Sequence, residues 1–292
     1  MAPVTGTQRD FLAVAPRYSP TRELLSAAAG RRGMDVVTLA VPGGTPFAGE
    51  REGGHYYGGP LFAARVADDL SVAPLEPADE WLSALPGEFT RRHVTTGTLE
   101  TARRLRRPMF VKPPRDKSFP AGVYADGHCL PGGLAPDTSV LISDVVTWKV
   151  EFRLFVLDGE VRTGSQYATF GQLDAAPLDG HRHRGTVMDF AERLLTACGR
   201  TLPSAVVVDV GLLRTPAGGP AGEWAVVEAN MAWFSNCYAA DPDRALDVVL
   251  RGAGPRARLT ERDRPFWRPG TAPAGAGPGK RRPHPLRQGP PG

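Results

Sequence analysis

Residues 205–230 read AVVVDVGLLRTPAGGPAGEWAVVEAN, and this stretch decides the fold. Two Val-rich runs, Ala205–Leu213 and Trp224–Ala229, predict strands, and the Pro/Gly-rich segment between them predicts the turn of a hairpin. The midpoint between Asp209 and Glu228 falls in the Gly-Gly pair at the centre of that turn. A regular hairpin therefore places the two carboxylates opposite each other, with their Cβ atoms about 5 Å apart.

Two like charges at this spacing destabilise a hairpin unless a cation neutralises them, and the flanking residues supply none. Asn230 lies two residues after Glu228, so it shares a strand face with it. Asp209, Glu228 and Asn230 therefore predict a site of hard oxygen ligands for Mg²⁺ or Mn²⁺, with positions left for phosphate oxygens. The alternative is an acidic solvent face on an edge hairpin, because a register slip of one residue would separate these side chains.

Upstream, Lys112 follows a predicted strand at 109–111, and Lys117 lies in the next loop. Only four lysines occur in this Arg-rich chain. A compact cation retained against that background is typical of a phosphate contact. The alternative is a pair of exposed loop lysines. The loop matches neither the P-loop pattern nor the dinucleotide-binding glycine pattern.

The segment between these sites predicts more antiparallel structure. A strand is expected at 139–146, and strands at 150–157 and 160–167 flank Asp158-Gly159, a pair typical of a type I′ turn. Alternation puts Glu151 and Arg153 on one strand face and Phe152 on the core face. Taken alone, Glu151 and Arg153 also fit a plain surface pair. Amphipathic helices are expected at 185–198 and 241–251.

The front of the chain predicts alternating strand and helix. Strands at 11–15 and 35–40 flank a helix at 20–32 capped by Ser19, which indicates a parallel βαβ unit. A loop at 41–59 and helices at 60–70 and 98–106 complete a front α/β domain at 1–107. The second half, 108–251, is then an α+β domain.

Charge is distributed unevenly. Residues 252–292 carry nine basic and two acidic residues, with eight Gly and nine Pro, although the net charge of the whole chain is only +4. Such a segment buries too little apolar surface to order itself, so we expect a disordered tail over 252–292. The rest of the chain is slightly acidic, so we expect no nucleic-acid binding by the folded body.

Three separated cysteines, Cys129, Cys198 and Cys237, indicate reduced thiols and no zinc site. No apolar run is long enough to span a membrane or to serve as a signal-peptide core. We expect a cytoplasmic protein without a membrane partner, and the high Arg, Ala, Gly and Pro content is typical of a high-GC bacterial genome. His181 and His183 form a weaker metal candidate that also fits a solvated loop. The aromatic stretch 233–238 fits either an acceptor pocket or helix packing.

The motifs together resemble the ATP-grasp superfamily, and in particular a clade of small ATP-grasp proteins. Those motifs are Lys112-Pro113 before a glycine-containing loop, a hinge strand at 141–146, Glu151-x-Arg153, Asp209, and Glu228-x-Asn230, in this order. The resemblance covers roughly residues 108–250. It implies an α/β ATP-grasp fold, with a module at 108–251 preceded by an N-terminal α/β pre-ATP-grasp domain.

The resemblance also implies roles. Lys112 would contact the α- or β-phosphate of ATP, and the loop 113–123 with Lys117 would close over the triphosphate. The backbone of Asp144, Val145 and Val146 would read the adenine, and Glu151 would hold the ribose. Arg153 would face the γ-phosphate, while Asp209, Glu228 and Asn230 would bind Mg²⁺. Residues 1–111 contain no lysine, so an arginine would replace the family's upstream lysine, with Arg91, Arg92, Arg103, Arg104, Arg106 and Arg107 as candidates.

The implied activity is an ATP- and Mg²⁺-dependent ligase that joins a carboxylate to an amine through an acyl phosphate. Its partners would be small-molecule or peptide substrates. An ATP-grasp phosphotransferase and a non-catalytic nucleotide-binding protein stay open as alternatives. The sequence indicates no oligomeric state.

Overall fold

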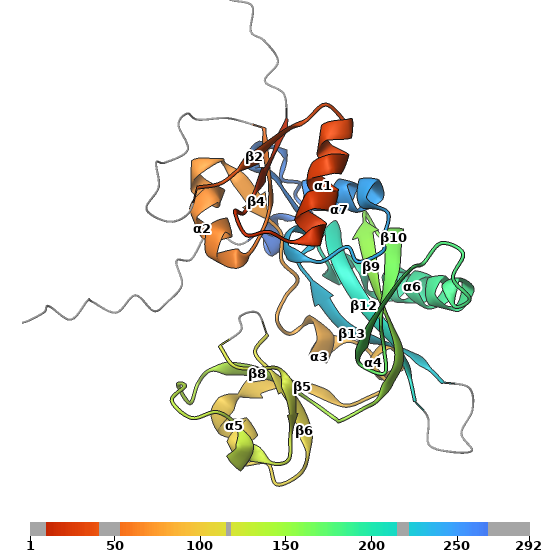
Figure 1. The fold of residues 1–292 in the computed structure, drawn as a ribbon. Coiled ribbons are helices and arrows are strands. Elements are labelled where there is room, and N and C mark those ends of the chain that lie inside the picture. The colour runs from red at the N-terminus through yellow and green to blue at the C-terminus, as the bar shows by residue number, and fades with distance from the viewer. Residues whose placement is uncertain (1–9, 41–52, 115–117, 215–221, 268–292) are drawn as a thin grey trace, which may run out of the picture.

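The computed structural model describes residues 10–40, 53–114, 118–214 and 222–267. Within them, the strands form sheets of three, four and five strands and one two-stranded pair. Figure 1 shows the three-stranded sheet and its helices at the top, the five-stranded sheet to the right, and the four-stranded sheet at the lower left. The mixed α/β class predicted from the sequence is confirmed.

The front of the chain forms the predicted βαβ unit. β1 (Phe11–Val14) pairs in parallel with β2 (Asp35–Thr38), and α1 (Pro20–Arg31) connects them. The Ser19 Oγ accepts from the Arg22 amide at 3.1 Å, which is the predicted N-cap. The residues predicted as the end of a loop instead form β3 (Gly54–Tyr57), parallel to β1. All four of its residues are buried, so no alternating pattern marked this strand.

Short elements link this sheet to the rest. α2 (Pro60–Asp69) is the predicted helix, and β4 (Val72–Pro74), α3 (Trp81–Ala84) and α4 (Gly87–Thr90) follow it. The last three were not predicted, because three or four residues are too few to show a period.

The four-stranded sheet has the order β5-β8-β6-β7 and is antiparallel throughout. Its strands are β5 (Val94–Thr98), β6 (Met109–Lys112), β7 (Gly122–Tyr124) and β8 (Ser139–Ser143), and α5 (Leu99–Arg103) packs on it. The strand predicted at 139–146 ends at Ser143, because the next four residues cross to the five-stranded sheet. β5, from the predicted front domain, belongs to this sheet.

The five-stranded sheet has the order β11-β10-β9-β12-β13. Its strands are β9 (Trp148–Leu157), β10 (Glu160–Thr169), β11 (Gln172–Pro177), β12 (Ala205–Leu213) and β13 (Trp224–Asn230). Asp158 and Gly159 have φ values of 53° and 85°, positive as the predicted type I′ turn requires.

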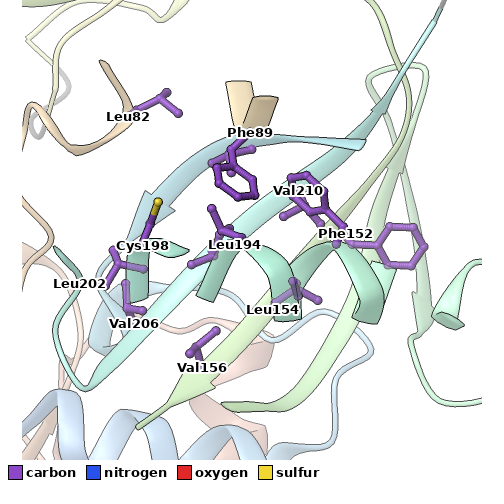
Figure 2. Packing of buried hydrophobic residues seen from close by; sticks show 14 of the residues in the cluster. Leu82, Phe89, Phe152, Leu154, Val156, Leu194, Cys198, Leu202, Val206 and Val210 are labelled. Carbon is purple, nitrogen blue, oxygen red and sulfur yellow. The ribbon is translucent and has the colours of Figure 1, made fainter. Parts of the chain in front are cut away.

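Helices cover both faces of this sheet. α6 (Arg184–Cys198) packs on the face that carries Phe152, Leu154 and Val156, and Figure 2 shows this core. α7 (Pro242–Gly252) and α1 pack on the opposite face, against Phe155. The expectation that the face of Glu151 and Arg153 points outward is therefore wrong, since both faces are covered.

The chain stays folded beyond the predicted start of the tail. β14 (Ala253–Pro255) pairs with β4, and Trp267 forms a bridge with Leu75. The Asp263 carboxylate is 1% exposed and accepts from the amide and hydroxyl of Ser204, both at 2.7 Å. The tail boundary at residue 252 is therefore wrong, and the remainder, 268–292, lies outside the described residues. Across the described ranges, no helix combines the length and apolarity that a membrane span needs.

Candidate functional site

The site begins at the predicted hairpin. Asp209 on β12 lies directly opposite Glu228 on β13, and the register shifts by one residue immediately afterwards. The Asn230 amide nitrogen donates to Asp209 Oδ2 at 3.2 Å and to Glu228 Oε1 at 2.9 Å. The predicted juxtaposition of the three side chains is confirmed.

A guanidinium that the hairpin alone did not indicate neutralises Asp209. Arg153 on β9 lies opposite Asp209, and its Nε and Nη2 donate to the two carboxylate oxygens at 2.9 and 2.7 Å. Burial lowers the pKa of Arg153, but the Asp209 carboxylate outweighs it and raises that pKa overall. The expectation that no basic partner is available is therefore wrong, because the partner comes from the neighbouring strand.

Lys112 reaches the same cluster from the four-stranded sheet. Its Nζ donates to Glu228 Oε2, and the lysine and glutamate side chains are 17% and 29% exposed. Burial opposes ionisation of Glu228, but Lys112, Asn230 and Arg153 lower its pKa to about 2. Two cations and two carboxylates thus join the two sheets, and their charges balance.

An open hollow of about 560 Å³ lies beside this cluster. Lys112, Leu141, Glu228 and Asn230 line it, together with the 76–82 segment that precedes and includes the first turn of α3. Because the hollow has a wall from each sheet, a molecule bound there would contact both.

Two tyrosines beside Arg153 were not predicted as site residues. Tyr167 on β10 donates to Glu151 Oε2 at 2.8 Å, and its ring stacks on Tyr238 with centroids 5.4 Å apart. Burial raises the pKa of Glu151, which is 9% exposed. Tyr238 falls within the aromatic stretch 233–238, which was the available sequence signal, whereas Tyr167 carried none.

The predicted hinge lies where the chain crosses between the sheets. Asp144 accepts from the His93 amide and from Arg107 Nη1, both at 3.0 Å, while Val145 is 45% exposed and Val146 follows it. Lys117 falls outside the described residues.

Arg92 lies at the other crossing, between α4 and β5. Its guanidinium donates to the Ser143 hydroxyl at 3.0 Å and to the carbonyls of Val226 and Val227 at 2.7 and 3.1 Å. It also lies over the Trp148 ring at 5.1 Å, and burial lowers its pKa to about 10. Of the candidate arginines, Arg92 is the one that bonds across both sheets.

The weaker candidates acquire structural roles. The rings of His181 and His183 pack on Phe152 at 4.9 and 6.4 Å. Trp233 is fully buried and donates to the Leu75 carbonyl, so it packs rather than lines a pocket. Burial raises the pKa of Cys237 to about 12, which argues against a nucleophile.

The donor chemistry suits magnesium. Over the described residues, no group of three or more acidic, His or Cys side chains is arranged to hold a metal. Asp209, Glu228 and Asn230 offer two carboxylates and an amide. Mg²⁺ typically takes one or two carboxylates and completes its shell with phosphate oxygens and water.

Several solved structures share the fold at low sequence identity. The N5-carboxyaminoimidazole synthetase from Staphylococcus aureus has a TM-score of 0.50 and 10% identity, over 85% of this chain and 80% of that one. A RimK domain ATP-grasp protein from Sphaerobacter thermophilus has a TM-score of 0.49 and 18% identity, over 82% and 99%. The D-alanine–D-alanine ligase from Bacillus anthracis has a TM-score of 0.45 and 12% identity, over 82% and 96%.

The comparison with curated proteins found no match. At the family level, residues 89–248 match the model of an ATP-grasp domain, family 2 of its clade. This match covers more than half of the 292 residues and includes Lys112, Arg153, Asp209, Glu228 and Asn230. The chain therefore belongs to the ATP-grasp superfamily.

Proposed function

We propose that this protein is an ATP-dependent ligase that joins a carboxylate to an amine. The observation that carries the proposal is the cluster of Lys112, Arg153, Asp209, Glu228 and Asn230 beside a hollow between two sheets. Within an ATP-grasp domain, such a cluster supplies cations for a polyphosphate and oxygens for its metal.

Each residue has a task in this proposal. Lys112 binds the α- or β-phosphate, and the loop 113–123 with Lys117 closes over the triphosphate. The backbone of 144–146 contacts the adenine, and Glu151 binds the ribose hydroxyls. Arg153 binds the γ-phosphate through the guanidinium edge that Asp209 leaves open.

Asp209, Glu228 and Asn230 would hold Mg²⁺. The ion would neutralise charge on the phosphate oxygens as the γ-phosphate is transferred. Because Lys112 and Arg153 already balance the two carboxylates, we expect the ion to bind together with the nucleotide.

The chemistry proceeds in two steps. A substrate carboxylate oxygen attacks the γ-phosphorus, the bond to the β-phosphate oxygen breaks, and ADP leaves. An amine then attacks the acyl carbon of the acyl phosphate, phosphate leaves with the bonding electrons, and the amine proton passes to solvent. Lys112 and Arg153 contribute by positioning and by offsetting negative charge, as phosphoryl transfer requires.

Thermal-shift measurements test the nucleotide site. We expect Mg²⁺·ATP to raise the Tm of the wild-type protein, and we expect Lys112→Ala and Glu228→Gln to abolish the shift. Glu192→Gln, an exposed position on α6, serves as the matched control and retains it. No shift with ATP or ADP in the wild type would refute nucleotide binding.

Turnover separates the ligase from its alternatives. A ligase releases ADP and phosphate only when carboxylate and amine are both present. Phosphate that stays on the acceptor would indicate a phosphotransferase, and a Tm shift without turnover over a broad substrate panel would indicate a non-catalytic nucleotide-binding protein.

A further inference from the structure

Tyr238 has a left-handed backbone conformation, with φ at +50°. A bulky side chain rarely adopts this region, because its Cβ crowds the backbone. Such a conformation persists where the surroundings impose it, and it clusters at functional sites. The amide of Cys237 donates to Thr21 Oγ1 at 3.0 Å, and the amide of Ala239 donates to Ser165 Oγ at 3.1 Å. Hydroxyls from two different elements thus hold the chain on both sides of Tyr238.

The held conformation brings the Tyr238 ring against Arg153. The Arg153 Cζ lies 5.3 Å from the Tyr238 centroid and 5.5 Å from the Tyr167 centroid. These distances fit cation–π contacts. Asp209 occupies Nε and Nη2 on one edge of the guanidinium. In the part of the chain that the structure describes, no protein acceptor takes the protons of Nη1.

We propose that Tyr238 is a positioning residue that acts through Arg153. Asp209 fixes one edge of the guanidinium, and the Tyr238 and Tyr167 rings limit its movement out of that plane. The remaining edge, Nη1, is thereby presented to the terminal phosphate. The inference rests on the proposed function, in which Arg153 binds the γ-phosphate.

A consequence is that Tyr238 governs the preference for ATP over ADP. ADP lacks the γ-phosphate, so a mobile Arg153 weakens ATP binding and leaves ADP binding unchanged. The preference is the ratio of the ADP and ATP dissociation constants, measured by calorimetry with Mg²⁺ and a non-hydrolysable ATP analogue. A merely structural role for Tyr238 would lower stability without changing this ratio.

We expect Tyr238→Leu to lower the ratio by about tenfold, the effect of one cation–π contact in a partly desolvated site. Tyr238→Phe keeps the ring and should keep the ratio. Tyr238→Gly removes the ring and also relieves the backbone, so it should lower the ratio while the protein stays folded. Ser71→Gly is the matched control, because Ser71 has φ at +49° in a turn between α2 and β4. It should leave the ratio unchanged.

A wild type that prefers ATP, together with Leu and Gly variants that keep the full preference, would overturn the role of Tyr238 alone. A wild type that binds neither nucleotide would overturn the proposed function and, with it, this inference. The two failures are therefore distinguishable in one set of titrations.

Discussion

Arg153 and Asp209 form a buried pair in which the geometry of the guanidinium matters as much as its charge. Two parallel bonds satisfy both oxygens of a carboxylate that is 1% exposed. A lysine ammonium is a point charge and cannot reproduce this two-bond contact. The sequence predicted that Asp209 needs a cation, but the cation is 56 residues away, and local patterns carry no information on which strand lies next to β12.

We predict that Arg153→Lys destabilises the fold by about 3 kcal/mol, because it leaves part of a buried carboxylate without a partner. Denaturant unfolding measures the change. Arg244→Lys is the control, since Arg244 pairs with Asp179 at 3.1 Å on the surface and should change stability by about 0.5 kcal/mol or less. Equal losses in the two variants would contradict the importance of the buried geometry.

His55 provides a pH-dependent contribution. Its Nδ1 contacts the Leu250 carbonyl at 2.7 Å, and burial lowers its pKa below 6.5. The unfolded chain then binds the proton more tightly than the folded one, so the stabilising effect is complete above pH 6.5 and declines as the pH falls through the folded pKa. We predict a Tm that falls below pH 6.5 more steeply in the wild type than in His55→Gln. Parallel Tm curves between pH 5 and 8 would exclude this contribution.

At the scale of elements, local signals predicted what local chemistry determines. The caps of α1 and α7 and the turn at Asp158-Gly159 lie where they were predicted. β11 was missed because five of its six residues are exposed, so it has no apolar alternation. β3 was missed for the opposite reason, since every residue is buried. In both strands, pairing with a distant partner overrides intrinsic preference.

The contact between α5 and the turn at 127–129 gives a prediction at this scale. A Cβ on Gly127 would lie 2.2 Å from the Arg103 carbonyl oxygen, and backbone cannot move aside as a side chain can. We expect Gly127→Ala to cost about 1–3 kcal/mol in unfolding free energy. Gly132→Ala, with no atom within 4 Å of the added Cβ, should be nearly neutral. A neutral Gly127→Ala would show that the turn can shift away from α5.

At the scale of the whole molecule, the two ends of the described chain are joined. β14 pairs with β4, and Arg258 contacts Asp10 through two bonds of 2.6 and 2.8 Å. Composition correctly indicated a Pro/Gly-rich terminus, but it could not show that residues 252–267 find partners on the front sheet. The division at residues 107 and 108 stays a prediction, and the pairing of β5 with β8 favours a boundary near residue 90.

Truncation tests this closure. We predict that a chain ending at Trp267 keeps the wild-type Tm within a few degrees, because it retains residues 252–267 and their contacts. A chain ending at Arg251 should lose about 5–10 °C, since it loses the β14 pairing and the buried Asp263 bonds. Equal Tm values for both truncations would show that residues 252–267 contribute nothing to stability.

Arg92 anchors one sheet to the other by bonding to the backbone carbonyls of Val226 and Val227. Every residue type carries that carbonyl, so substitutions at 226 and 227 leave the anchor intact. In an evolutionary record of the family, Arg92 should therefore change independently of the side chains at these positions. Methods that infer contacts from correlated substitutions would miss the link, and the joint between the two sheets would be invisible to them although two hydrogen bonds of 2.7 and 3.1 Å hold it.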